Sequence, residues 1–355
     1  MGIIYSKYKM FHYPEKLNSL DDKKLILPPL QVRIKPTNMC NHNCWYCAYK
    51  AENLQLGKDM VERDYIPLNK MLEIIKDLDE MGVKSLTFSG GGEPLTYKYM
   101  RESLEALSQT KVKFASLTNG SKLNGDVSQL FKQYGSWIRV SIDGWDDNSY
   151  AKYRNVKSGE FSKVIKNMYE FSKLNGECLL GVSIIIDKDN APHLENLVKL
   201  LKDTGVKSIK LSPCITHNES ELTNSYHSDF FEITKEKCKI IAQQYSDKDC
   251  EILDSYHLQL TSFKKKYSWC PYLQICPVIG ADLNVYACHD KAYNLDSGVL
   301  FSIKNKGFKE AWMNDKNSFF NINPTKNCNH HCVVDEKNRI LLEYLNIDKN
   351  HLEFV

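Results

Sequence analysis

Leu30-Gln-Val-Arg-Ile-Lys35 is a short apolar run, and Cys40-Asn-His-Asn-Cys44-Trp-Tyr-Cys47 follows it closely. The cysteines have the spacing CxxxCxxC, and no fourth ligand is evident beside them. Thiolates bind soft metals such as zinc, copper(I) and the iron of iron–sulfur clusters. Structural zinc has four ligands, usually from paired cysteine knuckles, whereas a cubane cluster held by three cysteines leaves one iron free to bind another molecule. The stretch therefore predicts a strand that leads into a metal-binding loop.

The segments that follow alternate between short apolar runs and helical patterns as far as about residue 213. Pro67 opens one helical segment, and residues 191–204 form another, each with apolar residues at helical spacing. Six strand–helix alternations indicate a parallel sheet covered by helices. We expect an α/β fold that closes as an open or partial (β/α)6 barrel of the TIM type. The expected strands are Val32–Ile34, Ser85–Phe88, Val112–Leu117, Trp137–Ile142, Leu179–Ile186 and Ser208–Leu211.

Polar, cysteine-containing or glycine-rich segments follow the first four expected strands. The cysteine loop follows the first strand, and Ser89-Gly-Gly-Gly-Glu93-Pro94 follows the second. Thr118-Asn119-Gly120 comes after the third, and Ser141-Ile-Asp143-Gly144 ends the fourth. In a (β/α) barrel, functional residues gather on the loops after the C-terminal ends of the strands. The sequence therefore predicts a site on that face of the barrel.

The composition argues against several classes of protein. The chain has 355 residues, and its 47 basic and 44 acidic side chains are interspersed, so no basic block points to nucleic acid as a partner. No apolar run approaches the roughly 18 residues that a membrane span needs, and residues 1–10 lack a signal-peptide pattern. We therefore expect a cytoplasmic protein that binds neither nucleic acid nor membranes.

The 12 cysteines are too many to be explained as small core residues alone. In a reducing compartment they are not expected to form disulfides, so the clustered ones indicate metal binding and the scattered ones indicate packing. The cysteines expected to be plain buried thiols are Cys178, Cys214, Cys238 and Cys250.

From about residue 214 the strand–helix alternation weakens. A helical stretch near residues 229–245 precedes a second cysteine-rich region, which has the character of a small metal-organised module. The expected segments are an N-terminal extension (1–30), the barrel (31–213), a helical connection (214–260), the metal-organised module (261–335) and a tail (336–355).

Cys40, Cys44 and Cys47, with Tyr46 before the third cysteine, are followed later by Gly91-Gly92-Glu93-Pro94. In this combination the chain resembles the radical S-adenosylmethionine (radical SAM) superfamily. The resemblance implies that the three cysteines hold a [4Fe–4S] cluster whose free iron is chelated by the amino and carboxylate groups of SAM. One electron, from a partner such as flavodoxin or ferredoxin, would cleave SAM into methionine and a 5′-deoxyadenosyl radical that takes a hydrogen atom from the substrate.

The resemblance also implies roles for other residues at the strand ends. In the family the glycine-rich loop, here Gly91 and Gly92, meets the methionine end of SAM, and Glu93 is a natural partner for its ammonium group. Arg154 resembles the arginine that holds the SAM carboxylate, a planar anion that a guanidinium suits. Three further residues are expected to contact the SAM carboxylate or ribose: Asn119, Ser141 and Asp143. For Asn119 and Asp143, a role in a turn or as a helix cap is the alternative.

Cys270-x5-Cys276-x11-Cys288, followed much later by Cys328 and Cys332, resembles the auxiliary-cluster region of SPASM and Twitch radical SAM enzymes. In these enzymes two cysteines precede a small hairpin, one follows it and a distant one completes the cubane. The cysteines suffice for one auxiliary [4Fe–4S] cluster and not for two, so the resemblance implies a small Twitch-like iron–sulfur domain.

The segment Gly280–Tyr286 fits the expected hairpin between the second and third of these cysteines. Cys328 is the preferred fourth ligand, and Cys332, His330 and His331 are alternatives. A zinc site built from the same residues is the alternative to an iron–sulfur cluster.

The resemblance leads to an expected reaction. Auxiliary clusters in relatives accompany two-electron oxidation of an alcohol or thiol, thioether formation and peptide epimerisation. Only 39 residues precede Cys40, which is short for the leader-peptide domain of many peptide-modifying members. We therefore expect an oxidoreductase that oxidises a small metabolite, such as a sugar, cyclitol or nucleotide-linked sugar, with Asp290 or His289 as the base.

Several alternatives remain at this point. Asp290 and His289 could instead support the metal ligands from behind. An epimerase or lyase outcome is compatible with the same cysteines, as is a peptide or protein maturase. A non-catalytic metal-binding protein is the alternative from another class.

Overall fold

The computed structural model describes residues 5–54, 56–314 and 316–353, and its central feature is a ten-stranded sheet. The strand order is β10-β9-β8-β1-β2-β3-β4-β5-β6-β7, and all neighbours from β1 to β7 pair in parallel. The parallel strands are β1 (Gln31–Ile34), β2 (Ser85–Phe88), β3 (Lys113–Thr118), β4 (Trp137–Ser141), β5 (Leu179–Ile186), β6 (Ser208–Pro213) and β7 (Glu251–Asp254).

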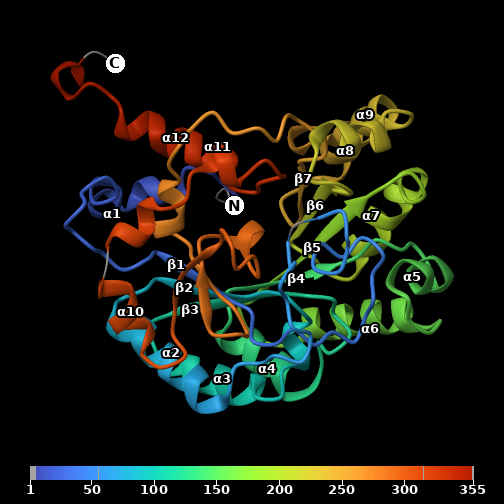
Figure 1. The fold of residues 1–355 in the computed structure, drawn as a ribbon. Coiled ribbons are helices and arrows are strands. Elements are labelled where there is room, and N and C mark those ends of the chain that lie inside the picture. The colour runs from blue at the N-terminus through green and yellow to red at the C-terminus, as the bar shows by residue number, and fades with distance from the viewer. Residues whose placement is uncertain (1–4, 55, 315, 354–355) are drawn as a thin grey trace.

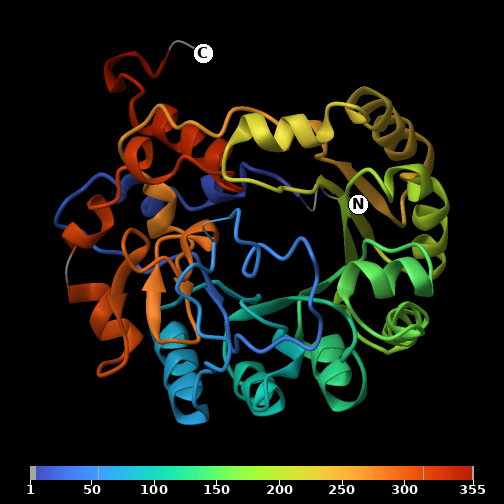
Figure 2. The same ribbon diagram turned by 45° about the vertical axis from the view of Figure 1, so that its right-hand side comes forward.

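The curved parallel sheet with helices on its outer side confirms the expected α/β barrel class (Figures 1 and 2). Every strand expected from the sequence is present, with its ends shifted by at most two residues. Strand β7 was not expected, because Glu251-Ile-Leu-Asp254 offers only two apolar residues and lies in the segment assigned to a helical connection.

The strands have one apolar and one polar face. In β4, Ile138 and Val140 are fully buried in the core shared with the helices, whereas Trp137, Arg139 and Ser141 alternate with them and face the inside of the barrel. A polar barrel interior is therefore a direct consequence of the strand sequences.

The helices pack their apolar sides onto the outer face of this sheet. In α2 the buried residues Met71, Ile74, Ile75 and Leu78 recur at the spacing of one helical face. The helices are α1 (Pro14–Asn18), α2 (Leu68–Glu80), α3 (Met100–Ser108), α4 (Gly125–Tyr134), α5 (Asp147–Arg154), α6 (Glu160–Lys173), α7 (Leu194–Asp203), α8 (Ser220–His227), α9 (Phe231–Tyr245), α10 (Phe308–Asn314), α11 (Pro324–Asn327) and α12 (Asp335–Leu345).

The C-terminal region extends the barrel sheet. Strand β8 (Val278–Ile279) pairs in parallel with β1, so that Arg33 lies opposite Val278. It also forms an antiparallel hairpin with β9 (Asn284–Tyr286), which pairs in turn with β10 (Val299–Ser302). The hairpin expected between Cys276 and Cys288 is thus present, and it places the second cysteine region beside the first strand of the barrel.

Other expectations about the fold can be compared with the structure. The isolated cysteines are buried, as expected, with exposed fractions of 2%, 1%, 0% and 3% for Cys178, Cys214, Cys238 and Cys250. Among residues 5–54, 56–314 and 316–353, no helix has the length and apolar character needed to cross a membrane.

Candidate active site

A cavity of about 450 Å³ lies at the C-terminal ends of the parallel strands. Its walls include the cysteine loop, the glycine-rich loop after β2 and residues at the ends of β3, β4, β5 and β6. The C-terminal region contributes His289, Asp290, His330, His331 and Val333. Both regions in which the sequence predicts chemistry therefore meet at one cavity.

Cys40, Cys44 and Cys47 all line this cavity and are half-buried. The backbone of their loop is fixed to helix α5, because the N–H of Asn43 donates to the carbonyl of Arg154 over 2.9 Å. Burial raises the pKa of Cys40 to about 11 and also raises that of Cys44. The free thiols of Cys40 and Cys44 are thus protonated at neutral pH, and coordination to a metal would deprotonate them.

Gly91 and Gly92 allow the loop after β2 to pack directly on the cysteine loop. A Cβ atom at Gly91 would lie 2.2 Å from Oδ1 of Asn38, and one at Gly92 would lie 2.0 Å from the carbonyl oxygen of Met39. Only glycine permits so close an approach. Both glycines also line the cavity, as expected for residues that meet SAM.

Glu93 is buried, and both of its carboxylate oxygens accept hydrogen bonds from the protein. Oε1 accepts from the hydroxyl of Thr118 over 2.6 Å and from the N–H of Leu95 over 3.0 Å, and Oε2 accepts from the N–H of Asn119 over 2.7 Å. Burial raises the pKa of Glu93, and these bonds oppose the rise. The residue expected to meet the SAM ammonium group therefore also joins the end of β2 to the end of β3.

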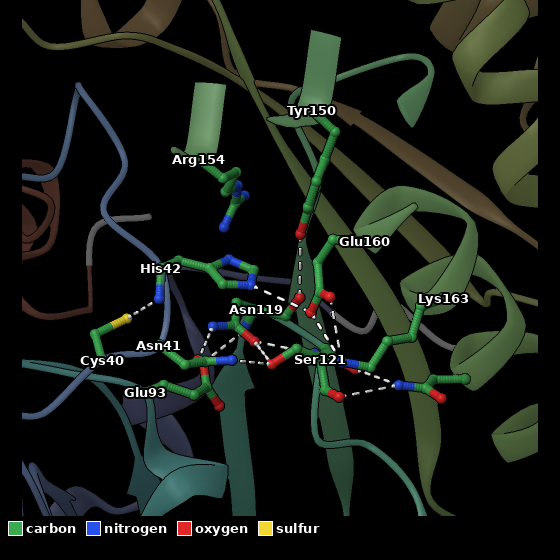
Figure 3. A network of polar contacts seen from close by, with 12 residues as sticks. Cys40, Asn41, His42, Glu93, Asn119, Ser121, Tyr150, Arg154, Glu160 and Lys163 are labelled. Carbon is green, nitrogen blue, oxygen red and sulfur yellow. Dashed lines mark hydrogen bonds and ion pairs between the residues drawn. The ribbon is translucent and has the colours of Figure 1, made fainter. Parts of the chain in front are cut away.

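Asn119 connects the end of β3 to the cysteine loop (Figure 3). Its Nδ2 donates to Oδ1 of Asn41 over 2.9 Å, and its Oδ1 accepts from the N–H and the hydroxyl of Ser121 over 3.0 and 2.7 Å. Nδ2 of Asn41 donates to the same hydroxyl over 2.8 Å. The Asn119 amide is thus engaged in the turn, which is the alternative that the sequence left open beside a SAM contact.

Arg154 and Asp143 form a buried ion pair in which Nη2 of Arg154 lies 2.6 Å from Oδ2 of Asp143. The same Nη2 donates to the carbonyl of Ser141 over 2.9 Å, and the hydroxyl of Tyr46 donates to Oδ2 of Asp143. The residues expected to contact SAM near the fourth strand are therefore close together, and here they contact one another.

His42 also lines the cavity, although it was not among the residues expected at the site. Its ring Nε2 lies 3.6 Å from a carboxylate oxygen of Glu160 at the start of α6, and its backbone N–H donates to the sulfur of Cys40 over 3.5 Å (Figure 3). Burial lowers the pKa of His42 to about 4. Its position between the first two cysteines was the only sign of this role in the sequence.

Four C-terminal cysteines share one environment. Burial raises the pKa of Cys288 well above its usual value, and negative charge on Asp290 and on the other three thiols raises it further. Those thiols belong to Cys270, Cys328 and Cys332. The two candidates for the distant ligand, Cys328 and Cys332, are thus both near Cys288.

Cys276 is buried in an apolar cluster with Tyr272 and Ile275. The charged groups that act on its thiol are Arg33 from β1 and Lys337 from α12, and both oppose the rise of its pKa caused by burial. Its sulfur therefore faces the barrel strand β1.

Asp290 belongs to the second cysteine region and reaches the cavity that the cysteine loop also borders. It follows Cys288 by two residues and lines the cavity. Its Oδ2 accepts from the N–H of Val333, the residue after Cys332, over 3.0 Å. Burial raises the pKa of Asp290 to about 6.

Lys35 is a second residue that was not expected at the site. Its side chain is fully buried, and its ammonium group donates to the hydroxyl of Tyr49 and the carbonyl of Gly90 and lies 3.4 Å from Nδ1 of His289. Burial lowers the pKa of Lys35 well below its usual value. It directly follows β1 and, two residues after Arg33, extends to the same side of the chain, but the contacts themselves depend on residues far away in sequence.

The family model of the radical SAM superfamily matches residues 34–201, from β1 to α7. A cysteine-type anaerobic sulfatase-maturating enzyme from Clostridium novyi is 24% identical over 321 residues, which cover 84% of this chain and 81% of the relative. This chain is a radical SAM enzyme. Its C-terminal region has the fold expected of a SPASM/Twitch-like auxiliary-cluster domain.

Other similar proteins share less sequence or a smaller part of their length. An S-adenosylmethionine-dependent nucleotide dehydratase from Lacinutrix mariniflava is 24% identical over 221 residues, or 61% of this chain and 44% of the relative. The structure of Streptococcus suis SuiB bound to precursor peptide SuiA has a TM-score of 0.62 at 15% identity, over 88% of this chain and 71% of SuiB, so the two share a fold. The radical SAM enzyme described here spans 64% and 44% of two curated relatives that it matches.

As a radical SAM enzyme with an auxiliary-cluster domain, the protein uses SAM and [4Fe–4S] clusters. The residues at the cavity fit these groups. Nε of Arg154 and Oδ1 of Asp143 are buried polar atoms that lack a hydrogen-bond partner within the described part of the chain. One is a donor and the other an acceptor, which suits an amino-acid group that carries both a carboxylate and an ammonium.

Within the described residues, no three His, Cys, Asp or Glu side chains are grouped to hold a single metal ion. A cubane cluster does not need such a group, because each thiolate binds a different iron atom. The three loop cysteines all border the same cavity, which is compatible with such a cluster.

Proposed function

We propose that this radical SAM enzyme oxidises an alcohol group of a small metabolite, of the sugar, cyclitol or nucleotide-linked sugar type, by two electrons. The observation that carries the proposal is the shared cavity. It is bordered by Cys40, Cys44 and Cys47 and also by Asp290. Asp290 is two residues from Cys288 and accepts a hydrogen bond from the N–H of Val333, the residue after Cys332. A substrate in this cavity would lie between a group that starts a radical and a group that can accept an electron.

We assign the SAM-binding cluster to Cys40, Cys44 and Cys47, and the auxiliary cluster to Cys270, Cys276, Cys288 and either Cys328 or Cys332. When bound, SAM and the first cluster supply a radical that removes a hydrogen atom from the substrate carbon, and the auxiliary cluster supplies an acceptor for one electron. The electron that starts the reaction would come from a protein such as flavodoxin or ferredoxin.

The chain itself would position the cofactor and remove a proton. Gly91, Gly92 and Glu93 border the place for the amino-acid end of SAM, with Arg154 and Asp143 nearby. Tyr46 bonds Asp143, and the carbonyl of Ser141 accepts from Arg154, so both hold the ion pair in place. Asn119 bonds Asn41 in the cysteine loop.

Asp290 is the proposed base, with His289 beside it as the second candidate. The alcohol carbon would lose a hydrogen atom and its hydroxyl would lose a proton to Asp290. The remaining electron would need an acceptor, which the auxiliary cluster would supply when bound, so that a carbonyl would remain and the substrate would lose two electrons and two protons overall. The Asp290 carboxylate lies at the cavity wall, where it can meet a substrate hydroxyl group.

The size of the cavity restricts the substrate. Drug-sized ligands occupy pockets of about 300–1,000 Å³, and SAM is itself such a ligand. A cavity of about 450 Å³ is in the lower part of this range, so a substrate that binds beside SAM has to be a small molecule or one side chain of a larger one.

A peptide or protein substrate is the second candidate, and a specific observation supports it. The Clostridium novyi relative, named as a sulfatase-maturating enzyme, aligns with 84% of this chain, which is more than the barrel alone. In that case one side chain of the peptide or protein would enter the cavity, and no free metabolite would bind there.

The proposal can be tested with anaerobically reconstituted enzyme, SAM and dithionite. We expect about eight irons per chain, as two [4Fe–4S] clusters require, and formation of 5′-deoxyadenosine. With substrate, one carbonyl product should form for each 5′-deoxyadenosine. Cys44→Ala should lose both about half of the iron and the cleavage of SAM, whereas Cys178→Ala, at a buried core thiol, should keep both.

Two results would contradict parts of the proposal. One or two zinc ions and no SAM cleavage would indicate a binding protein in place of an enzyme. Formation of 5′-deoxyadenosine with a substrate that is rearranged but not oxidised would exclude the oxidation and leave epimerase or lyase chemistry.

A further inference from the structure

Three cations extend from different strands into the interior of the barrel: Arg33 on β1, Arg139 on β4 and Lys210 on β6. We call them the lumen cations. Each alternates along its strand with residues that are buried against the helices. Lys210 lines the cavity, and so does Ser141, which is on the same face of β4 as Arg139.

The lumen cations have no ion pair with any carboxylate in the part of the chain that the structure describes. Two other buried cations near the cavity have polar partners: Arg154 pairs with Asp143, and Lys35 donates to Tyr49 and Gly90. Nε of Arg139, like Nε of Arg154, is buried without a hydrogen-bond partner among the described residues. The ammonium group of Lys210 makes no hydrogen bond to a described residue.

The lumen cations are close enough to affect one another. Burial lowers the pKa of Lys210 to about 8, and the positive charges of Arg139, Arg33 and Lys337 lower it further. Like charges in a partly buried place destabilise the protein unless an anion joins them. Such an arrangement is expected where an anionic ligand binds, because its binding relieves this repulsion.

Tyr5, in the N-terminal segment, contacts both Arg139 and Ser208. The guanidinium of Arg139 lies 4.7 Å from the ring centre of Tyr5, whose hydroxyl is 3.1 Å from the hydroxyl of Ser208 on β6. The ring covers one face of the guanidinium and leaves its N–H edge for a ligand. The cavity is therefore the side from which an anion would reach Lys210.

Hydroxyl groups stand beside Lys210 at the same level of the sheet. Ser183 of β5 lies opposite Lys210 of β6, and Ser141 of β4 lies opposite Ser183. All three residues line the cavity. An ammonium group with a neighbouring hydroxyl and two further cations suits a tetrahedral dianion, which has several acceptor oxygens.

We propose that the substrate carries a phosphate monoester group, which binds at Lys210 and Ser183 in the field of Arg33 and Arg139. This inference rests on the proposed function, since it names the class of small molecule that would be oxidised. The phosphate would anchor the molecule in the lumen and leave its alcohol end toward Asp290 and the cysteine loop.

The experiment uses the reconstituted, SAM-loaded enzyme and methyl phosphate as the probe, with binding followed by isothermal titration calorimetry. We expect methyl phosphate to bind at least tenfold more tightly than acetate. Lys210→Met should weaken methyl phosphate at least tenfold, and Lys210→Arg should restore most of the affinity. Lys188→Met, at an exposed lysine after β5, is the matched control and should bind like the wild type.

Arg139→Met is a second variant, to be used if Lys210→Met does not fold, and it should also weaken the probe. Equal affinity for acetate, unchanged affinity in both variants, or displacement of SAM by methyl phosphate would each overturn the inference. Cleavage of SAM by the wild type, measured in the same preparation, tests the proposed function separately. Cleavage without phosphate binding would reject this inference alone, and absence of cleavage would reject the proposed function.

Discussion

Gly92 shows how strictly a single residue is constrained at this site. A side chain there would meet the carbonyl oxygen of Met39 at 2.0 Å and the carbonyl carbon of Asn38 at 2.5 Å, both in the backbone before the first cysteine. Gly92→Ala should therefore displace the cysteine loop and lower the free energy of unfolding by about 1–3 kcal/mol, as overpacking commonly does. Urea unfolding and iron content after reconstitution measure the two effects.

Gly82→Ala is the control for this prediction. An added Cβ at Gly82 meets no atom within 4 Å, so that only its positive φ of 74° opposes the change. It should lose some stability but keep its iron. A Gly92→Ala variant with the iron content and SAM cleavage of the wild type would show that the close packing of the two loops is not required.

The ion pair of Arg154 and Asp143 gives a second prediction for single residues. Their side chains are 3% and 0% exposed, so Asp143→Asn would leave a buried guanidinium without its carboxylate. Such a loss typically costs about 3–5 kcal/mol. Asp189→Asn removes the partner of Lys152 in a pair whose side chains are 79% and 45% exposed, and it should cost less than about 1 kcal/mol. Equal losses in urea unfolding would argue against the buried pair.

At the scale of elements, the cysteine loop depends on contacts to β3 and α6. Asn41 reaches Asn119 and Ser121 at the end of β3, and His42 reaches Glu160 in α6 (Figure 3). Asn41→Ala keeps all cysteines but removes the link to β3. We expect a reconstituted Asn41→Ala enzyme to release iron to a chelator several times faster than the wild type.

Asn124→Ala is the matched control for the chelator experiment, because Asn124 is exposed at the start of α4 and its side chain makes no capping bond. It should release iron at the rate of the wild type. Identical rates for Asn41→Ala and the wild type would mean that the link from the loop to β3 does not hold the cluster in place.

For the molecule as a whole, the lumen cations predict how anion binding depends on pH. A lysine with a pKa of about 8 is protonated below that pH, and the anion binds the protonated form. The affinity for methyl phosphate should therefore be nearly constant between about pH 7 and pH 8 and fall up to about tenfold per pH unit above pH 8. The probe stays a dianion in this range, since the second pKa of a phosphate monoester is about 6.

Other charged groups act on Lys210 in this range. They are Arg33, Arg139, Lys337 and His331. Arginines do not titrate here, and burial lowers the pKa of His331 to about 4, so it is already neutral. Lys210→Arg isolates the effect of position 210, because its affinity should be nearly independent of pH from 8 to 9.5. The same decline in this variant and in the wild type would assign the titration to another group.

The six expected strands and the polar segments at their ends could be predicted from the sequence, because each leaves a local pattern, whereas the assignment of cysteines to clusters stays a prediction. Strand β7 is too short and polar to show such a pattern. The contacts of Lys35 with Gly90 and His289, and the convergence of the lumen cations, were not predictable in this way. They join residues from distant segments, and only the closure of the sheet brings them together.

The pairing of β1 with both β2 and β8 has a consequence for the synthesis of the protein. Strand β2 follows β1 soon in the chain, but Ile279, which pairs with Ile34, is made 245 residues later. At 5–20 residues per second, one edge of β1 remains open on the ribosome for roughly 10–50 seconds. An open strand edge is a template for wrong pairing, so the cell has a reason to shield the nascent barrel until its last neighbour arrives.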